Sequence, residues 1–128
     1  MQEDKKTVLI VDDDNMLLTR IASSLSSAGY TTLTAHDGQE GLDTALQSHP
    51  DLVLTDFQMP SLTGVEMAER IRRDGWGTNV PIVMMTNTYD LEAVNKMMMI
   101  NVKDYVIKSD MSLDAINDLV GSYLNTQA

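Results

Sequence analysis

The stretch from Asp51 to Pro60 limits the possible folds more than any other part of this sequence. It opens with a short apolar run, Leu52 to Leu54, which is too short for a helix and is typical of a buried strand. Pro60 disfavours helix in the residue before it, so the chain turns into a loop soon after Asp56. The stretch predicts a strand from Asp51 to Asp56. The aspartate at its carboxyl end is either a simple turn residue or part of a ligand site.

A strand-like run followed by a helical segment occurs five times along the chain; four of the runs are apolar, whereas Tyr30 to Ala35 alternates and is rich in threonine. Asp37 and Thr63 each begin a capping-box pattern that marks the start of a helix. Short strands bounded by turns suit a parallel sheet covered by helices on both faces, so the fold class is α/β. Strands are predicted over 7–11, 30–35, 51–56, 81–86 and 103–108, helices over 15–27, 37–48, 63–73, 90–99 and 112–124, and a loop over 75–79.

Chemically active side chains end four of these strands. In a parallel sheet the carboxyl ends lie at one edge, which would gather Asp12, Asp13, Asp56, Thr86 and Lys108. At roughly 4 Å and an effective dielectric of about 20, each pair of carboxylates repels by on the order of 4 kcal/mol. A raised carboxyl pKa or a bound hard cation would relieve this repulsion. A site with only oxygen ligands favours Mg²⁺ over zinc.

The lysine and the hydroxyl indicate a phosphate ligand at the same edge. An ammonium group suits phosphate oxygens as a point charge, and a hydroxyl can donate a hydrogen bond to them. Phosphoryl transfer needs this kind of charge neutralisation and positioning. A carboxylate can itself accept the phosphoryl group and form an aspartyl phosphate.

Composition argues against several other kinds of protein. The length of 128 residues suggests one domain over 1–128, and the absence of cysteine excludes disulfides and thiolate chemistry. The net charge of −10 argues against direct binding to nucleic acid, and the basic cluster Arg70, Arg72 and Arg73 is expected to complement the end of a helix. The first apolar run, Val8 to Val11, is too short for a signal peptide or a membrane span, so we expect a cytoplasmic protein away from membranes.

Several motifs in order resemble response-regulator receiver domains of the chemotaxis type. They are Asp12-Asp13-Asp14 after a valine, Asp56-Phe-Gln-Met-Pro-Ser-Leu-Thr-Gly64, the strand-ending Thr86, and Tyr105-Val-Ile-Lys108. Each motif alone is weak, but together, in order and at the right intervals, they are specific and cover essentially the whole chain. The resemblance implies a flavodoxin-like (βα)5 doubly wound sandwich, with a five-stranded parallel sheet in the order 2-1-3-4-5.

The resemblance also implies the ligands of the site. Asp56 would accept a phosphoryl group from a sensor histidine kinase or a phosphotransfer protein. Asp13, Asp56 and the backbone carbonyl of Gln58 would hold Mg²⁺, with Asp12 assisting through water. Asp14 is expected to cap a helix rather than to bind the metal.

Three further residues would transmit the signal in a domain of this kind. Lys108 would contact the phosphoryl oxygens, Thr86 would swing toward them, and Tyr105 would follow by turning inward. The output would pass through the surface of helix four, strand five and helix five to a downstream protein. The resemblance implies a phosphorylated signalling module of a two-component system, a monomer or weak dimer, and not an enzyme.

Two residues depart from the pattern of the family. Ser109 follows the lysine where the family usually has proline, often after a cis bond, which costs about 2.5–4 kcal/mol before any other residue. Either Ser109 tolerates that strain, or the bond is trans and the Lys108 loop differs. Asn87 replaces a usually small residue after Thr86, and we expect it to crowd the approach to Asp56.

Two other functions stay open at this point. A metal-dependent phosphatase could also use an aspartyl nucleophile, but such enzymes usually carry a second aspartate where this chain has Gln58, and they carry a cap domain. An adaptor that works without phosphorylation is left possible by Asn87 and Ser109. Met97, Met98 and Met99 cannot all face inward on one helix, so they form either a docking patch or part of the core.

Overall fold

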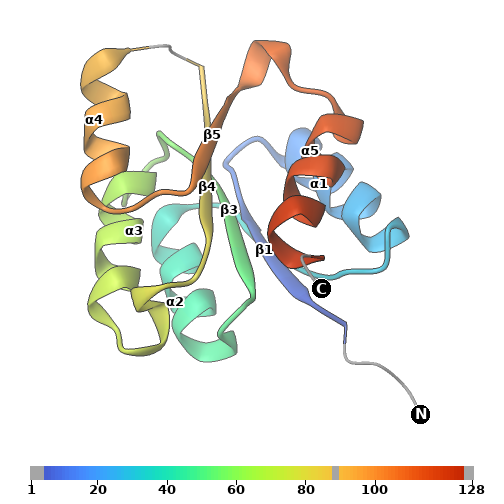
Figure 1. The fold of residues 1–128 in the computed structure, drawn as a ribbon, viewed down its shortest axis with the longest axis horizontal. Coiled ribbons are helices and arrows are strands. Elements are labelled where there is room, and N and C mark those ends of the chain that lie inside the picture. Colours follow the sequence, from blue (N-terminus) through green and yellow to red (C-terminus); the bar gives the residue numbers. More distant parts are fainter. Residues whose placement is uncertain (1–4, 88–89, 126–128) are drawn as a thin grey trace.

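Strands and helices alternate along the chain, as shown by a computed structural model that describes residues 5–87 and 90–125. Each strand is followed by a helix that returns across the sheet (Figure 1). The strands are β1 (Thr7–Val11), β2 (Thr31–Ala35), β3 (Leu52–Asp56), β4 (Ile82–Thr86) and β5 (Asp104–Ile107), and the helices are α1 (Asn15–Ser27), α2 (Gly38–Ser48), α3 (Gly64–Arg73), α4 (Leu91–Met99) and α5 (Leu113–Leu124).

The five strands form one parallel sheet in the order β2-β1-β3-β4-β5, which confirms the predicted flavodoxin-like topology. The observed strands and helices match the predicted ranges closely. The prediction of a loop over 75–79 is corrected by the structure, in which this segment contains a short 3-10 helix, η1 (Trp76–Thr78). A second 3-10 helix, η2 (Lys108–Asp110), directly follows β5 and was not predicted.

Two apolar clusters fill the space on the two faces of the sheet. α1 and α5 cover one face, and α2, α3 and α4 cover the other (Figure 1). The strands β3 and β4 are buried along their whole length, whereas the edge strand β2 is partly exposed. The core therefore fixes the central strands most firmly, and their carboxyl ends carry the candidate site.

The loop that leaves Asp56 is held tightly against the start of α3. Thr63 caps this helix in a complete capping box with Glu66, as the sequence predicted. Gly64 lies so close to the end of β3 that a Cβ atom there would overlap the backbone carbonyl of Asp56. A side chain at this position would therefore displace either the helix or the aspartate.

One arginine of the predicted basic cluster has a larger role than closing α3. Arg72 donates hydrogen bonds of 2.7–3.1 Å to the carbonyls of Gly77, Val80, Ile100 and Asn101. It thereby joins the end of α3 to the segment before β4 and to the end of α4. Among the described residues, no helix is long and apolar enough to cross a membrane.

Candidate functional site

Three carboxylates meet at the carboxyl edge of the sheet, where the sequence placed them. Asp12 and Asp13 follow β1, and Asp56 ends β3; each offers an oxygen, and these oxygens lie within 4.8 Å of one another. Asp12 and Asp56 are buried, whereas Asp13 faces the solvent. β1 and β3 are neighbours in the sheet, and this pairing brings Asp12, which follows β1, close to Asp56 at the end of β3.

Lys108 directly follows the edge strand β5, and its side chain reaches two of the three carboxylates. Its Nζ atom lies 2.9 Å from Oδ2 of Asp12 and 3.1 Å from Oδ2 of Asp56. No cis peptide bond occurs in the described residues, so Ser109 follows Lys108 through a trans bond. The two alternatives for this loop are thereby resolved: the bond is trans, and η2 turns the chain while the ammonium still meets both carboxylates.

Burial and charge shift the ionisation of this group of residues. Burial raises the pKa of the Asp56 carboxyl above its ordinary value of 3.8, and the charge of Asp12 raises it further, although Lys108 opposes both effects. Burial alone would lower the pKa of the Lys108 ammonium. Its hydrogen bonds to the two carboxylates, with their negative charges, outweigh burial and raise that pKa above 10.5. The lysine therefore stays charged at neutral pH.

The raised pKa of Asp56 predicts how stability depends on pH in Mg²⁺-free buffer. Above pH 3.8 the folded chain holds the Asp56 proton more tightly than the unfolded chain does, so this group makes the unfolding free energy fall as the pH rises toward the folded pKa. Urea unfolding with EDTA over a pH series would measure this for the parent and for Asp56→Asn. The stability of the parent relative to the variant should decline with pH and then level off; a rise with pH would contradict the assignment.

Asp13, Asp56 and Lys108 line a polar cavity of about 670 Å³. Its walls include Thr86 from the end of β4, Asn87 after it, and Gln58 from the loop after β3. Thr86 is buried, whereas Asn87 and Gln58 are exposed. The cavity is thus open to a ligand from solvent, and the hydroxyl of Thr86, the ammonium of Lys108 and the carboxylate of Asp56 all line it.

Tyr105 lies beside this cavity rather than in it. The tyrosine is half-buried and lines a neighbouring cavity of about 400 Å³ together with Asp90, Leu91 and Val94 of the α4 region. Strands β4 and β5 are paired so that Thr86 lies opposite Ile107 and Tyr105 lies opposite Met84. Tyr105 thus lies on β5 two residues before the level of Thr86, and it shares a cavity with the start of α4.

The cavity also contains a residue that the sequence analysis did not single out. Asp90 lines it and caps α4 by accepting a hydrogen bond from the backbone N–H of Glu92. Its position shortly after the strand-ending Thr86 was a usable signal, because a cap there must lie at the same edge. Asp14 caps α1, as predicted, by accepting from the N–H groups of Met16 and Leu17.

The donor set fits a hard divalent cation. Three carboxylates with nearby oxygens face a single lysine, which leaves an excess of negative charge around the shared position. Hard cations such as Mg²⁺ take oxygen ligands of this kind and usually bind through one or two carboxylates. The residues present are therefore suited to hold the cation that the sequence predicted.

Comparison with known proteins gives a consistent result over most of the chain. The family model for the response regulator receiver domain matches residues 8–120. The phosphate regulon transcriptional regulatory protein PhoB of Pseudomonas aeruginosa is 34% identical over 103 residues, which are 80% of this chain and 45% of that protein. Hybrid signal transduction histidine kinase D of Dictyostelium discoideum is 35% identical over 115 residues, or 90% of this chain and 7% of that protein. The chain thus spans less than half the length of these relatives.

Solved structures show the same fold. The chemotaxis protein CheY4 of Vibrio cholerae has a TM-score of 0.89 and 26% identity, with 94% of this chain and all of that chain covered. The receiver domain of sensor histidine kinase PA1611 from Pseudomonas aeruginosa, described with a magnesium ion coordinated in its active-site cleft, has a TM-score of 0.86 and 23% identity. That pair covers 96% of this chain and all of the other. These matches do not favour the phosphatase or adaptor alternatives.

Proposed function

Because this chain belongs to the response regulator receiver domain family and is a receiver domain of a two-component system, we propose that Asp56 is its phosphoacceptor. The observation that carries the proposal is the meeting of Lys108 with Asp12 and Asp56 at 2.9 and 3.1 Å. This contact joins the ends of β1, β3 and β5 at one point. It places a cation beside the carboxylate that would receive the phosphoryl group.

In the proposed reaction, an oxygen of the Asp56 carboxylate forms a bond to phosphorus while the bond from phosphorus to the donor breaks. The leaving group of the donor keeps the electron pair of that bond. Lys108 would neutralise charge on the phosphoryl oxygens, and the Thr86 hydroxyl would donate to one of them. Partial burial of Asp56 beside Lys108 would strengthen these charge contacts relative to the same contacts in bulk water.

Mg²⁺ is the cofactor that we propose for this site. Asp13, Asp56 and the backbone carbonyl of Gln58 would hold it, with Asp12 acting through water. When bound, it would supply positive charge that neutralises the carboxylates and the phosphoryl oxygens. Support comes from the three clustered carboxylates and from the magnesium in the cleft of the PA1611 receiver domain.

The proposed donor is a sensor histidine kinase or a phosphotransfer protein, which receiver domains in general use. This donor implies that the domain works in the cytoplasm. Receiver domains are in general signalling domains, and we propose that this one likewise acts as a switch rather than as an enzyme. Thr86 would turn toward the phosphoryl group and Tyr105 would follow into the adjacent cavity, which changes the surface of α4, β5 and α5.

Incubation with Mg²⁺ and acetyl phosphate, followed by intact mass measurement, tests the assignment of Asp56. We expect one phosphoryl group on the parent protein and none on Asp56→Ala, because the variant lacks the nucleophilic oxygen. Asp118→Ala is the matched control, since Asp118 is an exposed aspartate on α5. An Asp56→Ala protein that still gains one phosphoryl group would contradict the assignment, and turnover of many phosphomonoesters by the parent would favour an enzyme instead.

Asn87 is expected to slow phosphorylation by narrowing the approach to Asp56. The side chain lines the cavity, so its removal in Asn87→Ala opens space next to the acceptor without touching the three carboxylates. We expect a faster gain of the phosphoryl group, measured as the initial rate with acetyl phosphate and Mg²⁺. Equal rates for the variant and the parent would show that Asn87 does not obstruct the site.

A further inference from the structure

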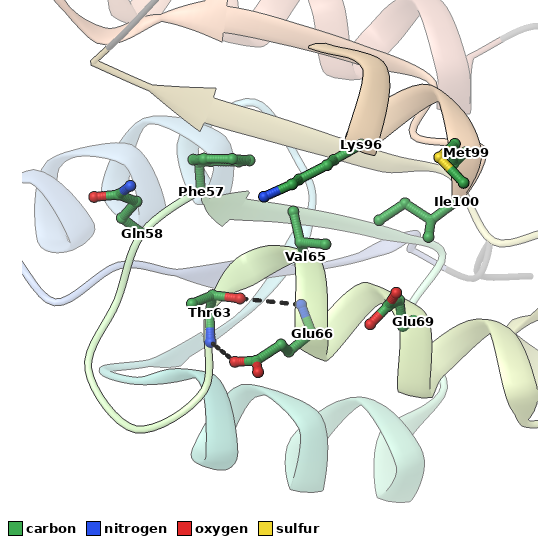
Figure 2. Close-up of a pocket in the computed structure, with 9 residues that line it drawn as sticks. All are labelled: Phe57, Gln58, Thr63, Val65, Glu66, Glu69, Lys96, Met99 and Ile100. Carbon is green, nitrogen blue, oxygen red and sulfur yellow. Dashed lines mark hydrogen bonds between the residues drawn. The ribbon is translucent and has the colours of Figure 1, made fainter. Parts of the chain in front are cut away.

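A groove between α3 and α4 adjoins the cavity of Asp56, and Phe57 and Gln58 line both. It encloses about 500 Å³, and apolar side chains of Phe57, Val65 and Ile100 form much of its lining (Figure 2). Met99 stands at its edge and is 85% exposed. An apolar groove beside a nearly fully exposed methionine is a surface that a partner can cover, because methionine adapts to many shapes.

The groove is open because α4 packs loosely against its neighbours. α3 packs closely against α2 and η1, whereas α4 has no comparably close helix partner in the described part of the chain. Within α4 only Ala93 and Met97 are buried, and Arg72 holds its carboxyl end through the carbonyls of Ile100 and Asn101. The two helix surfaces that face each other are therefore only partly used by the fold.

Opposite charges lie on the two walls of this groove. Lys96 on α4 points across it toward Val65 and Phe57, and Glu69 lies on the α3 side (Figure 2). Both side chains are exposed, and within residues 5–87 and 90–125 neither forms a hydrogen bond or ion pair. The neighbouring Glu66 differs, because its carboxylate already accepts from the N–H of Thr63. The groove thus offers one free cation and one free carboxylate across an apolar floor.

We infer that this α3–α4 groove binds an amphipathic helix of a partner protein. Such a helix would place an apolar stripe on the floor, an acidic residue toward Lys96 and a basic residue toward Glu69. The groove is lined by Val65 to Glu69 of α3 and by Lys96 to Ile100 at the end of α4, about 6 Å along each helix, so one to two turns of a partner helix would lie in it. The net charge of −10 disfavours a second copy of this chain and favours a partner that is basic overall.

This surface is separate from the α4–β5–α5 surface of the proposed switch. The groove is lined from the α3 side of α4, whereas Leu91, Val94 and Tyr105 lie around the other cavity. Binding to it can be measured on the unphosphorylated protein. The inference therefore does not depend on Asp56 being the phosphoacceptor.

The probe is a synthetic amphipathic helix of about 14 residues, with leucines at positions i, i+4 and i+7, lysines along one flank and glutamates along the other. Methionine methyl NMR follows its titration into the full chain. We expect saturable binding that shifts the methyl signal of Met99 and leaves that of Met98 unchanged, since Met98 is 70% exposed but does not line the groove. A peptide with serine in place of the leucines should not bind.

Charge-reversal variants make the inference specific. We expect the affinity for the peptide to fall by about tenfold or more in each of three variants, Met99→Glu, Lys96→Glu and Glu69→Lys. Met98→Glu should leave the affinity unchanged. The double variant Glu69→Lys with Lys96→Glu should bind nearly as well as the parent, because the peptide can dock in the reverse direction. All four positions are exposed, so loss of folding is not expected.

Three results would overturn the inference. One is the absence of saturable binding. A second is equal weakening by Met98→Glu, which would place the peptide on another face of α4. The third is a dimer of the parent in sedimentation that Met99→Glu abolishes, which would show that a second copy occupies the groove.

Discussion

Lys108→Met is expected to lower the unfolding free energy by about 3 kcal/mol in Mg²⁺-free buffer. The side chains of Asp12 and Asp56 are 0% and 9% exposed, and Lys108 is 2.9 and 3.1 Å from them. Without the ammonium, two nearly buried carboxylates face each other without a compensating cation. Removal of one partner of such a group costs more than the pair contributes, because the remaining charges stay buried.

Urea unfolding measures this effect, and Lys103→Met provides the matched control. Lys103 is an exposed lysine next to β5, so the control makes the same change of net charge without touching the site. It should change stability by no more than about 0.5 kcal/mol. Added Mg²⁺ should restore part of the stability of Lys108→Met, while phosphorylation of that variant should be slower by about 100-fold. Equal stability of Lys108→Met and Lys103→Met would contradict the role given to the ion pairs.

Gly64→Ala is the second change with a large expected effect. The new Cβ atom would overlap the backbone carbonyl of Asp56, and neither β3 nor the start of α3 can move without disturbing the core. We expect a loss of roughly 3 kcal/mol in unfolding free energy. Because the carbonyl belongs to Asp56, the proposed phosphoacceptor, we also expect slower phosphorylation by acetyl phosphate.

Gly75→Ala is the control for this glycine. Gly75 has a φ of −54° and no atom within 4 Å of a Cβ atom built on it, so alanine fits without strain. It should leave stability within about 0.5 kcal/mol or raise it slightly, and it should leave the phosphorylation rate unchanged. If Gly64→Ala behaved in the same way, the close packing of α3 against Asp56 could not be what positions the acceptor.

Much of the fold could be predicted because its signals are local. The apolar run from Leu52 to Leu54 predicted the strand that ends at Asp56. The capping-box patterns at Asp37 and Thr63 marked the starts of α2 and α3. The clustering of the side chains at the strand ends could also be predicted. The direction of a parallel sheet alone places them at one edge.

Other features depend on contacts between distant segments and could not be predicted in this way. The sequence placed Arg72 at the end of a helix but gave no sign that it donates to the carbonyls of Ile100 and Asn101 near the end of α4. It left two possibilities for the bond before Ser109, and only the structure shows that the bond is trans and that the chain continues as η2. The groove of Phe57 and Met99 likewise arises only from the separation of α3 and α4.

The position of the phosphoryl group on the chain shows whether Asp56 is the phosphoacceptor. Protein treated with Mg²⁺ and acetyl phosphate would be reduced with borohydride, which converts an aspartyl phosphate to homoserine, and then sequenced by tandem mass spectrometry. We expect homoserine at position 56 alone, because the Asp56 carboxylate lies 3.1 Å from the Lys108 ammonium. Homoserine at Asp12 or Asp13, or no converted residue in a protein that binds Mg²⁺, would contradict this expectation.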